Sequence, residues 1–309
     1  MFLLNSCDDG NLVQESIDFE DGTIQNCSSN DILYKINDKE ALIIEIPDTS
    51  FGTDPTTTSL TISETSNRVV YRFYNGTVAT DNICETIQPA TPIVLDQWTA
   101  KSGTIQILTT AKIETSTDGN NSTKITGYNH NITLKNVTFA INNGEQTFSS
   151  LSFGNYTTTA TSLALDFEKI LTKCSSSNVI YDFKNNGKEA FLLDIDPTLI
   201  VNEVTPANSP RTGLIGTTTN TFTYRLFSGL LSSSYFCNAT TPTTPTLSQE
   251  WTANAGVSGT SGIIEVTTTT NGPNTFKHTI TLKKVTLKKG NNSFTLGDSY
   301  ILGELDTTN

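Results

Sequence analysis

The sequence predicts an all-β fold made of two tandem, homologous β-sandwich-like domains. Three observations lead to this prediction. Thr, Ser and Asn fill much of the chain, whereas charged residues make up only 16% and Met occurs once; small polar and β-branched side chains suit pleated sheets and the turns between strands. No stretch sustains the 3.6-residue apolar period of an amphipathic helix. Finally, the second half of the chain repeats the first half in the same order.

The duplication runs along the whole chain. IDFEDGTIQNC from Ile17 returns as LDFEKILTKC from Leu165, and HNITLKNVTF from His130 returns as HTITLKKVTL from His278. Insertions between the matching stretches fall in turn-rich sequence, where length varies freely. We therefore divide the chain into residues 17–156 as the first β-repeat, residues 157–162 as a linker and residues 163–309 as the second β-repeat.

Two strand features recur in both repeats. DILYKI from Asp31 and EALIIEI from Glu40 are typical of a hairpin, and the second repeat carries the same pair around a longer turn. Further on, the two-residue apolar alternation slips by one residue at Lys135-Asn136 and again at Lys283-Lys284. Such a slip is typical of a β-bulge in a long strand. The number of short strand candidates favours a sandwich in each repeat, with a closed barrel as the alternative.

Four of the five cysteines match between the repeats. Cys27 and Cys84 in the first repeat correspond to Cys174 and Cys237 in the second. Four thiols permit three pairings, and the duplication favours Cys27–Cys84 and Cys174–Cys237. Each bridge would stabilise its repeat by about 4 kcal/mol and indicates an oxidising compartment. The alternatives are buried free thiols or a zinc site, for which the close cysteine spacing is missing. We expect no metal and no cofactor.

The fifth cysteine, Cys7, has no counterpart in the second repeat. It ends the run LLNSC and is followed by Asp8 and Asp9. This stretch resembles a bacterial lipobox, and the acidic pair is similar to the export signal of surface-exposed lipoproteins of Bacteroidetes-type bacteria. The resemblance implies that residues 1–6 are the remnant of a signal peptide, that Cys7 carries the lipid, and that residues 7–16 form a tether. Because the run before Cys7 lacks a charged region and is short, we expect the true start to lie upstream of Met1.

The net charge of the chain argues against one class of partner. The net charge is −12 and the pI is near 4.6, which argues against binding to a nucleic-acid backbone. A lysine cluster around residues 283–289 is interpreted as protection of a strand edge. The expected partners are the membrane, through the lipid on Cys7, and an extracellular glycan or protein ligand. The expected location is the outer membrane, lipid-anchored and exposed at the surface.

The candidate catalytic residues favour a non-enzymatic protein. His130 and His278 are in phase with the apolar residues that follow them, which predicts structural histidines. No nucleophile-elbow, zinc-protease or phosphate-loop motif occurs in the sequence. We assign no catalytic residue.

Acidic residues that recur between the repeats leave a carboxylate-dependent hydrolase as an alternative. Asp18 and Glu20 match Asp166 and Glu168, and Glu45 matches Asp194. A cross-strand pairing of Glu45 with Arg72, and of Asp194 with Arg225, would be a structural use of the last pair.

The aromatic residues offer a second kind of site. Trp98 and Trp251 lie in the same register of the two repeats, and we expect each to fill the core of its repeat. The alternative is that these residues, together with Tyr74, form an exposed platform for a sugar ring.

Taken together, these features predict a cell-envelope lipoprotein that presents two β-domains for ligand binding or adhesion. Its function is expected in the variable loops 48–67 and 196–220. A glycan-binding accessory of an outer-membrane saccharide uptake system is the alternative.

Overall fold

The structure is a computed structural model that describes residues 17–19, 22–184, 187–238 and 240–309. It is nearly all-β with antiparallel sheets, which confirms the predicted fold class. The first part of the chain forms β1 (Gln25–Asn26), β2 (Ile32–Asn37), β3 (Glu40–Glu45), η1 (Asp48–Ser50), β4 (Thr57–Thr61), β5 (Arg68–Tyr74), α1 (Asp81–Cys84), β6 (Val94–Thr115), β7 (Thr123–Ile141) and β8 (Gly144–Thr159).

The second part of the chain forms β9 (Thr172–Lys173), β10 (Val179–Phe183), β11 (Glu189–Asp194), η2 (Pro197–Leu199), β12 (Arg211–Leu214), β13 (Thr221–Phe227), η3 (Ser233–Tyr235), β14 (Leu247–Ala253), β15 (Ile263–Thr270), β16 (Thr275–Lys283), β17 (Thr286–Lys289), β18 (Asn292–Thr295) and β19 (Tyr300–Thr308). The helical elements of the described residues are single turns, and none has the length or composition of a membrane span.

The chain divides into two compact units that do not coincide with the sequence repeats. Unit 1 holds the described residues up to Phe51, together with Thr57–Leu108 and His130–Tyr156. Unit 2 holds Gly52–Thr56, Thr109–Asn129 and Thr157–Asn309. Two segments of the first repeat, 52–56 and 109–129, are therefore part of unit 2.

In unit 1, the long strand β6 pairs with one strand at its beginning and with another strand further along. The strand order is β1-β2-β3-β5-β6-β7-β8, and β4 pairs with β6. The first residues of β6 pair with β5, as at Trp98 opposite Tyr71, and later ones pair with β4, as at Gln106 opposite Ser59. The predicted β2–β3 hairpin is present, with Lys35 opposite Leu42. The core includes Leu42, Ile44, Trp98, Ile105, Ile132, Leu134 and Phe139.

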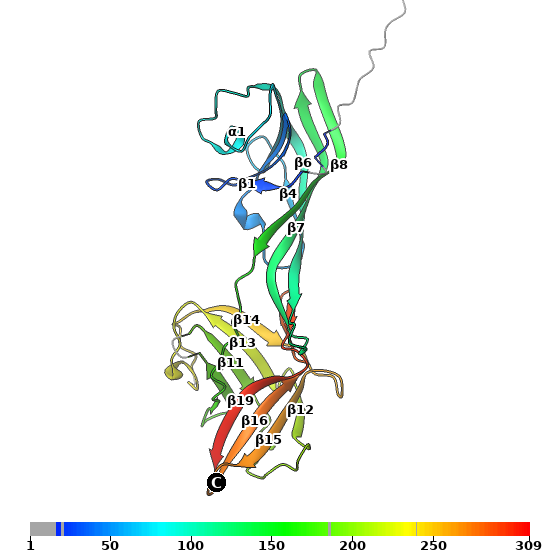
Figure 1. The fold of residues 1–309 in the computed structure, drawn as a ribbon. Coiled ribbons are helices and arrows are strands. Elements are labelled where there is room, and N and C mark those ends of the chain that lie inside the picture. Colours follow the sequence, from blue (N-terminus) through cyan, green and yellow to red (C-terminus); the bar gives the residue numbers. More distant parts are fainter. Residues whose placement is uncertain (1–16, 20–21, 185–186, 239) are drawn as a thin grey trace, which may run out of the picture. The chain divides into compact units, whose positions relative to one another are not determined.

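Unit 2 contains two separate sheets, which are built from shorter strands (Figure 1). One sheet has the order β18-β17-β14-β13-β11-β10-β9 and the other β12-β15-β16-β19. The chain leaves one sheet after Ala253 and enters the other at Ile263. Side chains of both sheets share one core, which includes Phe191, Tyr224, Trp251, Ile264, Ile280 and Leu305. Two sheets that pack their side chains into one core form a sandwich-like architecture.

A left-handed residue lies at each predicted slip of the strand period. Asn136 has φ of 48° and Lys284 has φ of 49°, a region that non-glycine residues rarely adopt. In unit 1 a Cβ added to Gly103 would lie 2.8 Å from the Cα of Val137, one residue past the bend. In unit 2 the N–H of Gly262 donates to the carbonyl of Lys284 at 3.0 Å. A glycine thus faces the bend in both repeats.

The expected cross-strand pair of Glu45 with Arg72 is wrong. Register places Glu45 opposite Arg68, and their side chains form an ion pair at 2.9 Å. Arg72 lies opposite Ala41, and its Nε donates to Gln97 at 2.8 Å. The cause is the antiparallel register, which carries Arg72 along β5 away from the end of β3 that holds Glu45.

The expected pair of Asp194 with Arg225 is wrong for the same reason. Asp194 lies opposite Thr221, whereas Arg225 lies opposite Ala190. The Nε of Arg225 instead donates to Glu250 on the neighbouring strand β14 at 2.6 Å.

Candidate functional site

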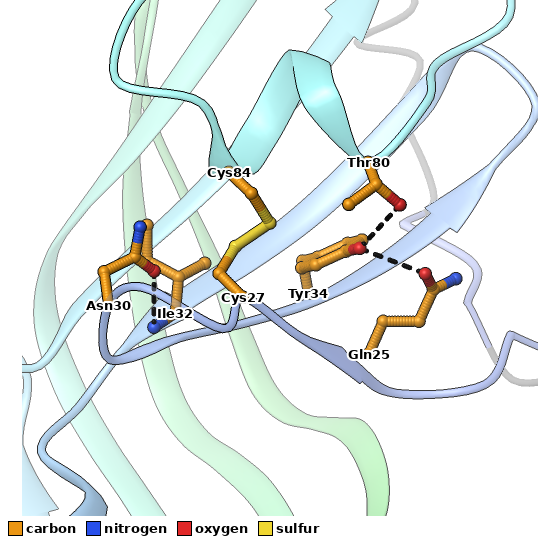
Figure 2. The surroundings of a disulfide bond; sticks show 7 residues. All are labelled: Gln25, Cys27, Asn30, Ile32, Tyr34, Thr80 and Cys84. Carbon is orange, nitrogen blue, oxygen red and sulfur yellow. Dashed lines mark hydrogen bonds between the residues drawn. A yellow bond between two sulfur atoms is a disulfide. The ribbon is translucent and has the colours of Figure 1, made fainter.

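Both predicted disulfides are present, one in each unit. Cys27–Cys84 joins the turn after β1 to the helical turn α1, with a Cα–Cα distance of 5.4 Å. Figure 2 shows the hydroxyl of Tyr34 beside this bridge, within hydrogen-bond distance of Gln25 Oε1 (3.0 Å) and Thr80 Oγ1 (2.9 Å). The bridge and these bonds hold the loop after β5 against the face of the sheet opposite the main core.

The second disulfide also fixes a loop against the sheet, but aromatic packing lies beside it instead of hydrogen bonds. Cys174–Cys237 spans a Cα–Cα distance of 5.3 Å. Tyr181, which matches Tyr34, stacks on Phe236 with ring centroids 4.3 Å apart. Aromatic packing in unit 2 thus takes the place of the hydrogen bonds that fix the loop in unit 1.

The three aromatic residues considered as a sugar platform are buried. Trp98, Trp251 and Tyr74 are 4%, 3% and 1% exposed. The Nε1 of Trp98 donates to Asp96 at 2.9 Å, and that of Trp251 donates to Gln249 at 3.3 Å. This finding corrects the platform interpretation for these residues, because a buried ring face cannot stack on a ligand.

The two histidines are fully buried. The ring of His278 lies between two hydroxyls, with Nδ1 at 2.8 Å from Thr268 Oγ1 and Nε2 at 2.8 Å from Thr307 Oγ1. The ring of His130 packs against Phe51, with centroids 5.1 Å apart. Burial lowers the pKa of both imidazoles, which favours their neutral form.

The recurring acids lie at separate places in the described residues. Asp166 forms an ion pair with Lys184 at 2.8 Å, and Asp18 and Glu168 are exposed. Within the described ranges, no three His, Cys, Asp or Glu side chains are grouped to hold a metal ion. Glu20, the lipidation candidate Cys7 and the tether lie outside the described residues.

Part of the variable loop 48–67 has a structural role in unit 2. Asp54 Oδ1 accepts from the backbone N–H of Asn291 at 2.7 Å, and the carbonyl of Pro55 accepts from the Asn291 side chain at 3.0 Å. Residues 52–56 therefore hold the turn between β17 and β18.

A cavity of about 550 Å³ lies within unit 2, and we call it the Tyr300 cavity. Three segments line it: the β6–β7 turn, the start of the second repeat and the loop between β18 and β19. Leu163, Leu165 and Tyr300 are half-buried and Leu296 is buried, whereas the charged lining residues are exposed. The lining residues are Glu114–Asp118, Asn120, Ser122–Lys124, Leu163–Leu165, Thr295, Leu296 and Tyr300.

Asn120 fixes the β6–β7 turn against the loop before β19. Its Nδ2 donates to the carbonyl of Leu296 at 3.2 Å, and its Oδ1 accepts from the N–H of Ser299 at 3.0 Å. Its carbonyl accepts from the N–H of Asp298 at 2.7 Å. Ile125 and Tyr128, which follow on β7, lie in the core of unit 2. This wall of the cavity is therefore a built part of the unit.

Negative charge surrounds Tyr300 at the inner wall. Burial, followed by the charges of Asp182, Asp166 and Glu189, raises the pKa of the Tyr300 phenol. Asp182 is itself only 5% exposed, and burial raises its pKa to about 6. The Nζ of Lys169 lies 5.8 Å from the centroid of the Tyr300 ring.

The acid at position 182 replaces a base in the first repeat. Asp182 in VIYDF matches Lys35 in ILYKI, and both side chains are buried. The ammonium of Lys35 donates to the carbonyl of Phe19, whereas Asp182 accepts from the N–H of Lys169 at 3.0 Å. Sequence reasoning missed this site, although the reversed charge between the two copies was visible in the alignment of the repeats.

Comparison with protein-family models, with curated proteins and with solved structures finds no match to this chain.

Proposed function

We propose that this chain is a non-enzymatic, surface-tethered lipoprotein that binds an extracellular ligand in the Tyr300 cavity. The observation that carries the binding role is the cavity itself. Its volume of about 550 Å³ lies in the range of small-molecule sites. Apolar surface from Leu163, Leu165, Leu296 and Tyr300 lines it together with a larger number of polar side chains.

Two further observations support the location. Each unit contains a disulfide at a matching position, and such bridges persist in oxidising compartments. The run LLNSC before Asp8 resembles a lipobox, so Cys7 is the proposed attachment point of the lipid. A lipid anchor with a polar tether would hold both units outside the membrane.

The location is tested by fatty-acid labelling and protease treatment of intact cells. Expressed with a complete leader in a Bacteroidetes-type host, the protein should incorporate the labelled fatty acid and be degraded by added protease. The Cys7→Ala variant should do neither. Label in both proteins, or protection of the wild type from protease, would contradict the proposed anchor.

The binding role is tested on the purified, oxidised chain by thermal shift with three probe classes: neutral oligosaccharides, carboxylates and aliphatic amines. Ligand that binds only the folded state raises the melting temperature with concentration. At least one class should do so, and the shift should be lost when Leu165→Asp places a charge in the cavity wall. No shift with any class would contradict the binding role.

A further inference from the structure

The cavity has an acidic outer rim. Glu114 and Lys124 form an ion pair at 3.4 Å, so the lysine is already matched by one carboxylate. Asp118 adds a second carboxylate. Its Oδ1 accepts from Ser116 Oγ at 2.7 Å and from the N–H of Asn120 at 2.9 Å. These bonds lower the pKa of Asp118. Both end on the same oxygen, so Oδ2 can accept from a ligand.

Carboxylates also lie near the inner wall. Glu189 Oε1 accepts from the N–H of Ala164, which lines the cavity, at 3.4 Å. Asp182 lies close enough to Tyr300 to raise the pKa of its phenol. Because Lys124 is paired with Glu114, Asp118 leaves the rim with an excess of negative charge, and such a charge concentrates ligands of opposite sign.

The walls also suit a hydrocarbon stem next to a cation. Leu163, Leu165 and Leu296 line the cavity beside the Tyr300 ring. The ring already has one ammonium near it, that of Lys169 at 5.8 Å, and a ring face attracts cations within about 6 Å. Long amines bury an aliphatic stem along such surfaces while the charged end keeps polar contacts.

From this geometry we propose that the Tyr300 cavity binds a ligand with a primary ammonium group on an aliphatic stem, held by Asp118 and the Tyr300 ring. The proposal rests on the binding role given above and names its ligand class. Two sources share this chemistry, a free polyamine and the lysine side chain of a peptide. The charge of the rim and inner wall argues against carboxylate ligands.

The test is calorimetric titration of the purified, oxidised full chain at pH 7 in low salt. The probes are 1,5-diaminopentane, spermidine, and Nα-acetyl-lysine amide, with its Nε-acetylated form and a neutral oligosaccharide as controls. The amines should bind with a stoichiometry of one, and the two controls should not. Preference for the diamines indicates a polyamine, and preference for the lysine amide indicates a peptide.

The variants separate a specific site from general attraction to an acidic protein. Asp118→Asn should weaken amine binding about fivefold, the scale of one exposed charge pair, and Tyr300→Leu should weaken it further. Glu145→Gln in unit 1, which removes an equal charge from the ion pair with Lys101, should leave it unchanged. Equal loss in Asp118→Asn and Glu145→Gln would overturn the proposal.

The failures of the two proposals are distinguishable. Binding of the oligosaccharide or of a carboxylate without binding of the amines would overturn the ligand class and leave the binding role standing. No binding by any probe, with native tryptophan fluorescence retained, would overturn both.

Discussion

The buried carboxylate of Asp182 accepts a hydrogen bond from the backbone N–H of Lys169 at 3.0 Å. At the matching position of the first repeat, the ammonium of Lys35 donates to the carbonyl of Phe19. Both contacts attach the start of a repeat to the first strand of its hairpin. The duplicated fold thus keeps one structural contact with opposite polarity, and unit 2 gains a buried acid next to its cavity.

The contribution of Asp182 to the stability of unit 2 should fall as the pH rises from about 4 to 6. The pKa of Asp182 is raised from its ordinary value of 3.8 to about 6 in the folded chain. The folded state therefore binds this proton more tightly, and ionisation destabilises it. Asp182→Asn keeps an acceptor for Lys169 and removes the charge. It should stabilise unit 2 at pH 7 by about 3 kcal/mol.

This prediction is measured by urea unfolding in a Trp98→Phe background, where Trp251 reports on unit 2. His278 acts in the opposite direction in the same pH range, because its lowered pKa costs stability as the pH falls. Comparing the parent and the Asp182→Asn variant at each pH cancels this contribution, since both proteins contain His278. Equal stability differences at pH 4 and pH 7 would contradict the assignment.

Both histidines should titrate below pH 6.5. Burial is the main cause of the lowered pKa in each, and the chain contains no other histidine. NMR chemical shifts of the two imidazoles, followed from pH 8 downward, measure this directly. A midpoint at or above 6.5 for either ring in the folded protein would show that the ring is hydrated or paired with an acid.

Gly297→Ala should destabilise unit 2 by more than about 2 kcal/mol, because backbone strain adds to a steric clash. Gly297 has φ of 96°, and an added Cβ would clash with both the side chain and the carbonyl of Asn120. Gly119→Ala is the matched control, since φ is 80° there and nothing lies within 4 Å of the added Cβ. Urea unfolding measures the loss of stability in each variant. Equal losses would mean that the β6–β7 turn, which contains Asn120, is not packed against Gly297.

Removing a disulfide should destabilise the unit that contains it. Cys174→Ser with Cys237→Ser opens a bridge across 63 residues, which costs about 4 kcal/mol in the chain-entropy model. Cys27→Ser with Cys84→Ser is the counterpart for unit 1. Variants that keep only Trp98 or only Trp251 report the stability of unit 1 and unit 2 separately. If opening a bridge destabilised only the unit that does not contain it, the assignment of one bridge to each unit would be contradicted.

Local patterns made much of the fold predictable. The β2–β3 hairpin and the disulfide pairing within each repeat follow from features that recur between the two repeats. The bent long strand predicted for the second repeat is wrong, because the chain passes at Lys284 from β16 in one sheet to β17 in the other. The ion pair of Glu45 with Arg68 did not follow, because register depends on which strands become neighbours and where their turns begin.

The candidate site was harder to predict because its walls come from distant parts of the sequence. Residues 109–129 belong to the first repeat in sequence and to unit 2 in the structure. Nothing in the local pattern around Asn120 indicates its partners near Leu296. The buried charge reversal between Lys35 and Asp182 was the available signal, because a buried charge needs a compensating partner.

The central claim is that a lipid-anchored, disulfide-bridged tandem acts outside the cytoplasm. Mass spectrometry of the protein isolated from its own membrane without reduction tests this most directly. The account predicts an acylated peptide that begins at Cys7 and two cross-linked peptide pairs, Cys27 with Cys84 and Cys174 with Cys237. An unmodified Cys7 together with four free thiols would contradict it.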